Sequence, residues 1–234
     1  MTAKADKRLR DKQEEVLEAA LAPAAARGWT RSVLEDAILA AGIDAPLAAR
    51  AFPRGVADLV VALNTHFDRK MGEALRKCDV EQMRYGERVG LAARLRLEAM
   101  ARHRDAARSA MAFHALPTNA MDGAKCLTRT SDAIWRAVGD TSSDFSFYTK
   151  RATLAVVLAA TTLVWLDDVK GVTWPAFLDR RLRDVLAIRK FRTRAEDAVA
   201  HTARGVAARL RRGFQAGLPG LSGTWPDFFR SPRR

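Results

Sequence analysis

Paired carboxylates are the first candidates for chemistry in this sequence, because two acidic side chains in one site can act as a general acid and a general base. Glu14–Glu15 and Asp167–Asp168 are adjacent along the chain and fall within helical patterns. Neighbouring residues on a helix point to different sides, so neither pair converges on one substrate. We interpret both pairs as solvated or helix-capping residues and predict no catalytic residue.

The histidines and cysteines do not have the spacing of a metal site either. No histidine has a second ligand three or four positions away, and the cysteines form no C-x-x-C pair. We therefore expect no metal, no cofactor and no disulfide framework. The residues concerned are His66, His103, His114 and His201, with Cys78 and Cys126 as free thiols.

Sequence motifs of the common enzyme classes are absent. The chain contains no H-E-x-x-H, no Walker loop and no G-x-S-x-G. The glycines Gly217, Gly220 and Gly223 follow no predicted strand, so they do not indicate a phosphate-binding loop. We predict that the protein is not an enzyme.

The elements around these residues belong to a strongly basic chain. Its 40 basic and 27 acidic residues leave a formal net charge of +13. Such a field favours polyanions, and charge alone does not choose between nucleic acid and an anionic membrane. The first segment, Met1–Glu15, is charged throughout and lacks the apolar stretch of a secretory signal, so we expect a cytoplasmic location.

Apolar residues recur at spacings of three and four almost everywhere, which predicts an all-α fold without a sheet. Gly28 and Gly42 end the first helices, Thr30 or Ser32 caps the second, and Asp44 caps the third, with Pro46 in its first turn. The predicted helices are Lys7–Ala26, a short helix ending near Ala41, another ending near Ala51, Val56–Leu75, Glu87–His103, Asp105–Leu116, Met121–Val138, Phe145–Asp168, Pro175–Lys190 and Arg194–Phe214.

The two short helices within Gly28–Phe67 have the arrangement of a helix-turn-helix, so DNA binding has to be considered. The second helix, Ala45–Ala51, offers one long basic side chain, Arg50, and no Asn, Gln, Ser or Thr to contact base edges. We therefore interpret this module as a packing or dimer scaffold and do not expect nucleic acid as a partner.

The segment Arg151–Leu166 is the most apolar of the chain. Its uncharged part, Ala152–Leu166, has 15 residues, fewer than the roughly 18 to 20 that cross a bilayer. We expect a central helix that is buried on several sides. Small residues along it leave two interpretations open, an internal apolar cavity for a lipid or a dry packed core; these are Ala155, Ala159 and Ala160.

Two further features each allow two interpretations. The adjacent aromatics Phe147 and Tyr148 at the start of the apolar helix indicate either core packing or, if exposed, a partner surface. The segment Arg194–Phe214 is amphipathic and rich in arginine, which fits either a helix on an anionic membrane or a helix docked on its own bundle. Its apolar face contains Val199, Val206, Leu210 and Phe214.

The block Gly139–Leu154, with sequence G-D-T-S-S-D-F-S-F-Y-T-K-R-A-T-L, closely resembles the COQ-nine family of ubiquinone biosynthesis. Supporting segments are Trp29–Gly42, Phe52–Gly55 and Phe177–Arg181, and the similarity covers about residues 10 to 215. The family is similar in fold to TetR regulators. The resemblance implies a helix-turn-helix module (1–75), a helical domain for lipid binding and dimerisation (76–190), and an amphipathic membrane helix with a tail (191–234).

The resemblance also implies the site residues. An isoprenoid or quinone lipid would contact Trp135, Leu154, Val157, Leu158, Thr161 and Trp165. A quinone-modifying hydroxylase would bind Phe147, Tyr148 and Arg151, where Phe147 replaces the usual tryptophan of the family. Val199, Val206, Leu210 and Phe214 would contact the inner face of the cell membrane, and the protein would be a homodimer.

These observations together predict a lipid-binding accessory protein that presents a quinone precursor from the membrane to a modifying enzyme. The alternative is a TetR-like repressor that binds DNA, which the charge and the helix-turn-helix pattern favour.

Overall fold

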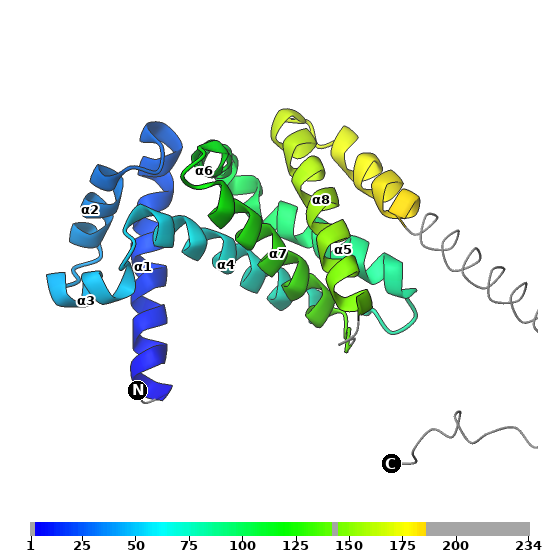
Figure 1. Ribbon diagram of the computed structural model, residues 1–234, viewed down its shortest axis with the longest axis horizontal. Coiled ribbons are helices and arrows are strands. Elements are labelled where there is room, and N and C mark those ends of the chain that lie inside the picture. Colours follow the sequence, from blue (N-terminus) through cyan, green and yellow to red (C-terminus); the bar gives the residue numbers. More distant parts are fainter. Residues whose placement is uncertain (1–2, 142–144, 186–234) are drawn as a thin grey trace, which may run out of the picture. The chain divides into compact units, whose positions relative to one another are not determined.

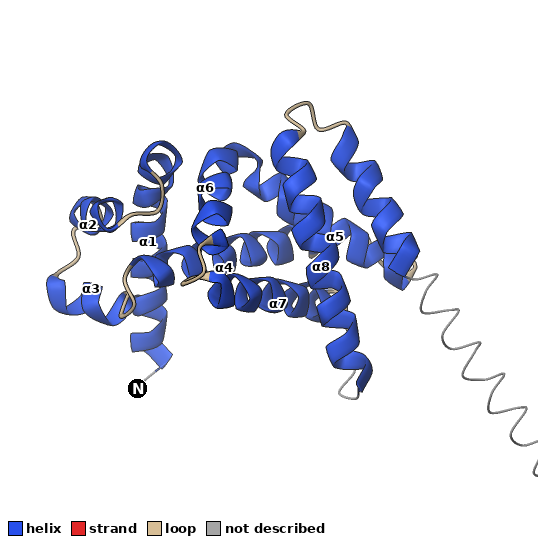
Figure 2. Cartoon of the chain, turned by 45° about the horizontal axis from the view of Figure 1, so that its top comes forward, coloured by secondary structure: helices blue, strands red, loops and turns tan. Residues whose placement is uncertain are grey.

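Every regular element in residues 3–141 and 145–185, the part of the chain that the computed structural model describes, is a helix (Figure 2). The all-α prediction is therefore confirmed for these residues. The helices are α1 (Ala3–Arg27), α2 (Arg31–Ala40), α3 (Ala45–Ala51), α4 (Val56–Leu75), α5 (Tyr85–Met100), a 3₁₀ turn (Ala101–His103), α6 (Arg104–Ala115), α7 (Ala120–Ala137), α8 (Phe145–Asp167) and a last helix over 173–185.

The predicted helix boundaries hold where a side chain or a glycine specifies them. The Thr30 hydroxyl accepts a hydrogen bond from the amide of Val33 at the start of α2, and the Asp44 carboxylate accepts one from Leu47 at the start of α3. Gly42 has a positive φ of 61°, a conformation that costs a side chain energy, and it ends α2 as predicted.

The N-terminal helices pack directly on the rest of the described chain, as predicted. Helix α1 contacts α2, α3, α4 and α6. The indole of Trp29 donates a hydrogen bond to the carbonyl of Ala106 on α6, and Gln13 donates one to the carbonyl of Ala51 at the end of α3. Residues Met1–Val185 form one compact unit, and the boundary near residue 75 stays a prediction.

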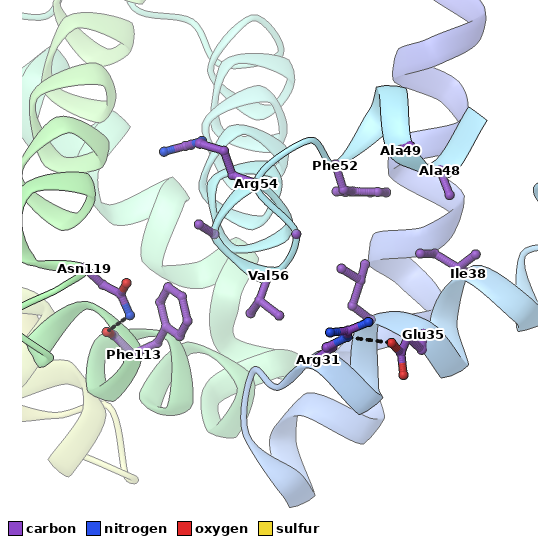
Figure 3. A pocket seen from close by; sticks show the side chains of 13 residues that line it. Arg31, Glu35, Ile38, Ala48, Ala49, Phe52, Arg54, Val56, Phe113 and Asn119 are labelled. Carbon is purple, nitrogen blue, oxygen red and sulfur yellow. Dashed lines mark hydrogen bonds and ion pairs between the residues drawn. The ribbon is translucent and has the colours of Figure 1, made fainter. Parts of the chain in front are cut away.

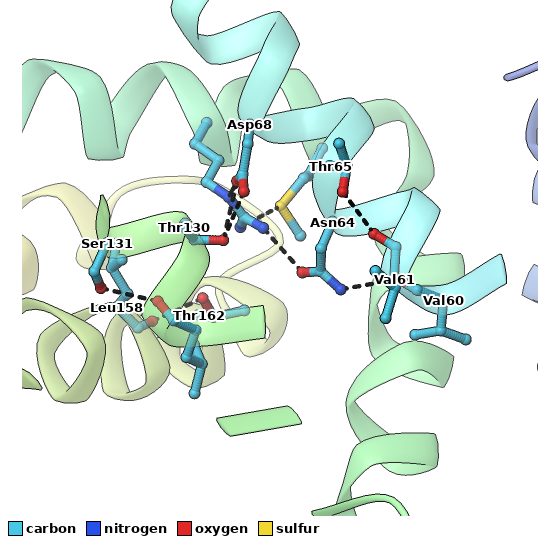
Figure 4. Close-up of polar contacts among 12 residues, drawn as sticks. Val60, Val61, Asn64, Thr65, Asp68, Thr130, Ser131, Leu158 and Thr162 are labelled. Atoms are coloured by element: carbon cyan, nitrogen blue, oxygen red, sulfur yellow. Dashed lines mark hydrogen bonds and ion pairs between the residues drawn. The ribbon is translucent and has the colours of Figure 1, made fainter. Parts of the chain in front are cut away.

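A buried charged network joins α4, α5 and α7 (Figure 4). The guanidinium of Arg96 donates to Asp68 at 2.7 Å and to the side-chain carbonyl of Asn64 at 3.1 Å. The hydroxyl of Thr130 on α7 donates to the same carboxylate at 3.0 Å. Because Arg96 and Asp68 are both largely buried, this network fixes the register of three helices.

Helix α8 is anchored at its C-terminal end by two arginines of α6. Arg104 donates to the carbonyl of Asp168 at 2.9 Å, and its guanidinium lies 4.6 Å from the centre of the Trp165 ring. Arg108 donates to the carbonyl of Leu166. Cations at this position also interact favourably with the negative end of the helix dipole, so both arginines hold α8 against α6.

Asp168 caps the last helix. A capping role was predicted for the Asp167–Asp168 pair, and it is confirmed for Asp168. Its carboxylate accepts hydrogen bonds from the amides of Thr173 at 2.5 Å and Trp174 at 2.9 Å. The amide of Trp174, followed by those of its neighbours, lowers the pKa of Asp168 because these donors stabilise the charged form.

The helix over 173–185 packs closely on α5. A Cβ atom at Gly90 would lie 3.3 Å from a methyl carbon of Leu182, and Arg94 on α5 forms an ion pair with Asp179. This helix begins two residues before the predicted Pro175, because Asp168 supplies its cap. Its predicted end at Lys190 lies outside the described residues, as does the whole predicted helix Arg194–Phe214.

Candidate functional site at helices α7 and α8

The residues predicted to contact a lipid lie on α7 and α8, two helices in contact (Figure 1). All are buried, from Thr161 with none of its surface exposed to Trp135 with 9%. The hydroxyl of Thr161 donates to the carbonyl of Val157 within the helix, so it brings no unsatisfied polar group into the core. The full set is Trp135, Leu154, Val157, Leu158, Thr161 and Trp165.

The prediction that α8 is buried on several sides holds only in part, because the helix contacts α5, α6 and α7 but leaves one side exposed. One side packs into the core, and the opposite side exposes large apolar residues, with 70% of Tyr148, 69% of Val156 and 56% of Leu163 accessible. We call the exposed series Tyr148, Ala152, Val156 and Leu163 the α8 stripe. Sequence periodicity did not distinguish it, because the helix is apolar on both sides.

Helix α8 is long and apolar enough to cross a membrane by length and composition, over Phe147–Asp167, which is 21 residues and longer than the uncharged stretch considered above. Its packing differs from that of an isolated membrane helix. It places the charged Arg151 in the protein interior, and its Leu154 side forms part of the protein core. Within the described residues, α8 is therefore a core helix with one exposed apolar side.

A buried ion cluster positions the start of α8. The guanidinium of Arg151 donates to Asp132 on α7 at 2.7 Å and to Asp140 at 3.3 Å. Lys150 forms a second ion pair with Asp140 at 2.8 Å. Arg151 is 4% exposed and therefore acts here as a structural anchor. A binding partner would contact the exposed residues that Arg151 holds in place.

The aromatic pair lies on this anchor. The guanidinium carbon of Arg151 lies 3.4 Å from the centre of the Phe147 ring, and the Phe147 and Tyr148 rings meet edge to face at 5.1 Å. Phe147 is half-buried, whereas Tyr148 is exposed. Of the two interpretations of this pair, core packing is excluded for Tyr148, and partner binding stays a prediction.

Sequence reasoning missed that Tyr85 belongs to the same region. Its ring stacks on Trp135 at 5.6 Å, and Trp135 in turn donates a hydrogen bond to the carbonyl of Lys150. Tyr85 lies at the first residue of α5, 50 positions from Trp135 along the sequence. No local spacing signals such a contact, because it depends on how α5 packs against α7.

A groove lies between the N-terminal helices and α6 (Figure 3). Its volume is about 590 Å³, and its lining is mostly apolar, including Ile38, Phe52, Val56 and Phe113. Arg54 at its edge is held by Asp58 and Asp122, which raise the pKa of its guanidinium. None of the residues predicted to contact lipid lines this groove.

Helix α3 has few of the groups that read DNA. Of its seven residues, Ala48 and Ala51 are buried, and Arg50 is the one long polar side chain that it exposes. Asp44 caps the helix, where its carboxylate accepts a hydrogen bond from the amide of Leu47.

No group of three or more metal-ligating side chains occurs within residues 3–141 and 145–185. Cys126 is buried there, and burial raises the pKa of its thiol. The residues predicted to contact the membrane, Val199, Val206, Leu210 and Phe214, lie outside the described residues.

The region that contains α7 and α8 is similar to known proteins. A family model described as COQ9 matches residues 120–189, which include α7, α8 and the last helix. A Homo sapiens protein named "Ubiquinone biosynthesis protein COQ9, mitochondrial" is 28% identical over 184 residues, which are 74% of this chain and 57% of that protein.

Two further relatives extend the comparison. The Xenopus laevis protein named "Ubiquinone biosynthesis protein COQ9-A, mitochondrial" is 30% identical over 75% of this chain and 58% of its own length. A Dictyostelium discoideum protein named "Probable ubiquinone biosynthesis protein coq9, mitochondrial" is 34% identical over 50% of this chain and 38% of its own. The chain thus spans less than two thirds of each relative. The family model and these relatives together show that the chain resembles the COQ9 family, with the model matching residues 120–189 and these relatives aligning over 50 to 75% of this chain.

Proposed function

We propose that this protein is a lipid-binding accessory protein of ubiquinone biosynthesis that presents an isoprenoid or quinone lipid from the membrane to a quinone-modifying hydroxylase. The observation that carries the proposal is the COQ9 family match over residues 120–189, since it covers the helices on which the predicted lipid and partner residues lie. The curated relatives are named ubiquinone biosynthesis proteins. The proposal assigns no catalytic step to the chain itself.

The rigid start of α8 supports the partner part of the proposal. An aromatic residue that is exposed and yet held on a buried anchor loses little conformational entropy on binding, which is a property of interface hot spots. Tyr148 has this geometry, because Phe147 and Arg151 fix the backbone and ring next to it. The proposed partner therefore contacts Tyr148 directly and Arg151 indirectly.

The α8 stripe supports the proposed homodimer. A series of exposed apolar residues without an intervening charge marks a surface that is covered in the working protein. The peripheral membrane contact is proposed for Val199, Val206, Leu210 and Phe214. The relatives are named mitochondrial, and for this chain we propose the inner face of the cell membrane, reached from the cytoplasm.

Liposome flotation tests the membrane part. The intact chain should float with vesicles that contain anionic lipid, and a chain truncated before Arg194 should bind them much more weakly, because four apolar membrane residues and most of their neighbouring arginines are removed. Equal binding by both chains, or binding by neither, would remove this part of the proposal.

Pull-down with the hydroxylase tests the partner part. A Tyr148→Ala variant should lose binding, while a Val169→Ala variant, equally exposed but beyond the end of α8, should keep it.

The DNA-binding alternative is not favoured, because α3 combines buried alanines with an acidic cap.

A further inference from the structure

A histidine with buried ring nitrogens lies where α6 turns into α7. His114, in the last turn of α6, has both nitrogens shielded from solvent, and neither has a hydrogen-bond partner among the described residues. Buried polar atoms in proteins nearly always have such a partner, so this histidine brings an electrostatic cost into the fold. We call His114, the turn 116–119 and the first residues of α7, 120–123, the α6–α7 corner.

The side chain of His114 packs against the backbone of Gly123 on α7. A Cβ atom at Gly123 would lie 3.1 Å from Cγ and 3.4 Å from Nδ1 of the imidazole, so the ring occupies the space that a side chain would take there. Within α6 the same ring meets Phe113 edge to face, with the ring centres 5.8 Å apart. The ring therefore fills the contact between the two helices, and its departure would loosen that contact.

The carboxylate nearest to this ring already has cationic partners. One oxygen of Asp122 forms an ion pair with Arg54 at 2.9 Å, and the other lies 4.0 Å from the ammonium of Lys125. Arg54 is itself paired with Asp58 on α4 at 2.7 Å. A positive charge on His114 would therefore compete with two cations for Asp122.

The neutral form of His114 fits the corner better than the charged form. Burial lowers the pKa of His114 from its ordinary value of 6.5, while the backbone of Asn119 and the charge of Asp122 act more weakly in the opposite direction. A protonated ring would carry two N–H donors where neither nitrogen has an acceptor. In solvent, the same charge would lie at the C-terminal end of α6, where the helix dipole stabilises a cation. Acid therefore favours an open corner with the ring outside.

Opening of the corner would change the groove between the N-terminal helices and α6. Phe113 and Asn119 line this groove, and the Asn119 side chain donates a hydrogen bond to the Phe113 carbonyl at 3.0 Å (Figure 3). Arg54 lines the same groove and forms the ion pair with Asp122. A shift of the first turn of α7 away from α6 would therefore move one wall of the groove together with the carboxylate that holds Arg54.

We propose that the α6–α7 corner is a pH-sensitive switch, which is closed while His114 is neutral and opens when the ring takes up a proton and leaves Gly123. The switch controls the shape of the groove that Phe113 and Asn119 line. The residues proposed to contact lipid, partner or membrane lie outside the corner, so the switch can fail or succeed independently of them.

Hydrogen–deuterium exchange of the full-length protein tests the switch, with rates corrected for the intrinsic pH dependence of amide exchange. A group that binds a proton only in the open state makes opening more favourable as the pH falls below its ordinary pKa, here 6.5. Between pH 7.5 and pH 5.5, protection of the Gly123 amide, which is bonded to the Asn119 carbonyl, should fall by up to roughly tenfold. Amides in the middle of α4 should keep their protection.

Two variants assign the effect to one histidine. His114→Phe keeps a ring that cannot take up a proton, so it should remove the acid effect on Gly123. His103→Phe is the matched control and should keep that effect, because burial also lowers the pKa of His103, which lies at the other end of α6.

An NMR titration of the unmodified chain needs no variant. The ring carbon Cε1 of His114 and the amide of Gly123 should titrate with one common midpoint below pH 6.5. Protection that does not fall in acid, an equal fall in His114→Phe, loss of the effect in His103→Phe, or separate midpoints for the ring and the amide would each overturn the proposal.

Discussion

Replacement of Arg151 by methionine tests whether the ion cluster at the start of α8 works as the contacts indicate. Methionine keeps an unbranched apolar stem in the space of the arginine stem and removes the charge. In the variant, neither carboxylate is left without a cation. Asp140 keeps Lys150 at 2.8 Å, and Asp132 keeps Arg136 at 2.8 Å.

The expected loss in the free energy of unfolding follows from these two remaining ion pairs. Removal of one partner from a buried ion pair costs roughly 3 to 5 kcal/mol when the remaining charge is isolated. Loss of hydrogen bonds to a charged group that keeps another partner costs about 2 kcal/mol. We therefore expect Arg151→Met to lower the free energy of unfolding by about 2 kcal/mol.

Arg96→Met is the matched comparison. Among the described residues Asp68 has no second ion pair, and it would keep only the Thr130 hydroxyl. This variant should therefore lose about 4 kcal/mol. Urea unfolding followed by circular dichroism measures both values. If Arg151→Met costs as much as Arg96→Met, the compensation by Lys150 and Arg136 does not operate and the reasoning is refuted.

Three further predictions concern the packing and capping of the described helices. Gly123→Ala should destabilise the protein by roughly 1 to 3 kcal/mol, because the new Cβ would lie 2.9 Å from the Cβ of His114. Gly90→Ala should destabilise it less, since the flexible end of Leu182 can move away. Thermal unfolding compares the two variants. Asp168→Ala should lower the melting temperature at neutral pH. The pKa of Asp168 is lowered in the folded chain from its ordinary value of 3.8. The stability that Asp168 contributes is therefore present above pH 3.8 and is lost as the pH falls below it. In acid, the melting temperatures of Asp168→Ala and the unmodified chain should converge. Arg104→Ala should expose Trp165, seen as a red shift of tryptophan fluorescence, while Arg102→Ala should leave it unchanged, because Arg102 lies on the surface and makes no contact with Trp165 in the described structure.

Local signals in the sequence predict the helices well. Glycines with positive φ and capping side chains act within a few residues, so both ends of α2 and the start of α3 follow from Thr30, Gly42 and Asp44. The buried side of α8 follows in the same way from the spacing of Leu154, Val157 and Leu158. These features depend on neighbours along one helix.

The remaining features depend on contacts between helices and could not be predicted. The α8 stripe shows no difference in polarity from the buried side, so only the packing of α8 against α5, α6 and α7 reveals which side is exposed. The role of Arg151 depends on Asp132 and Asp140, which lie 19 and 11 residues away along the chain. The stacking of Tyr85 on Trp135 likewise requires the packing of α5 against α7.

The central claim is that the chain carries a lipid of the quinone pathway, and lipid extraction tests it most directly. The purified full-length protein is extracted with organic solvent, and the extract is analysed by mass spectrometry beside that of a Leu158→Trp variant. Leu158 is a buried α8 residue, 4% exposed, among those proposed to contact the lipid, so a larger side chain there should displace a lipid from this region. The account predicts an isoprenoid or quinone lipid in near-stoichiometric amount from the unmodified chain and much less from the variant. An extract of the unmodified chain without such a lipid would contradict it.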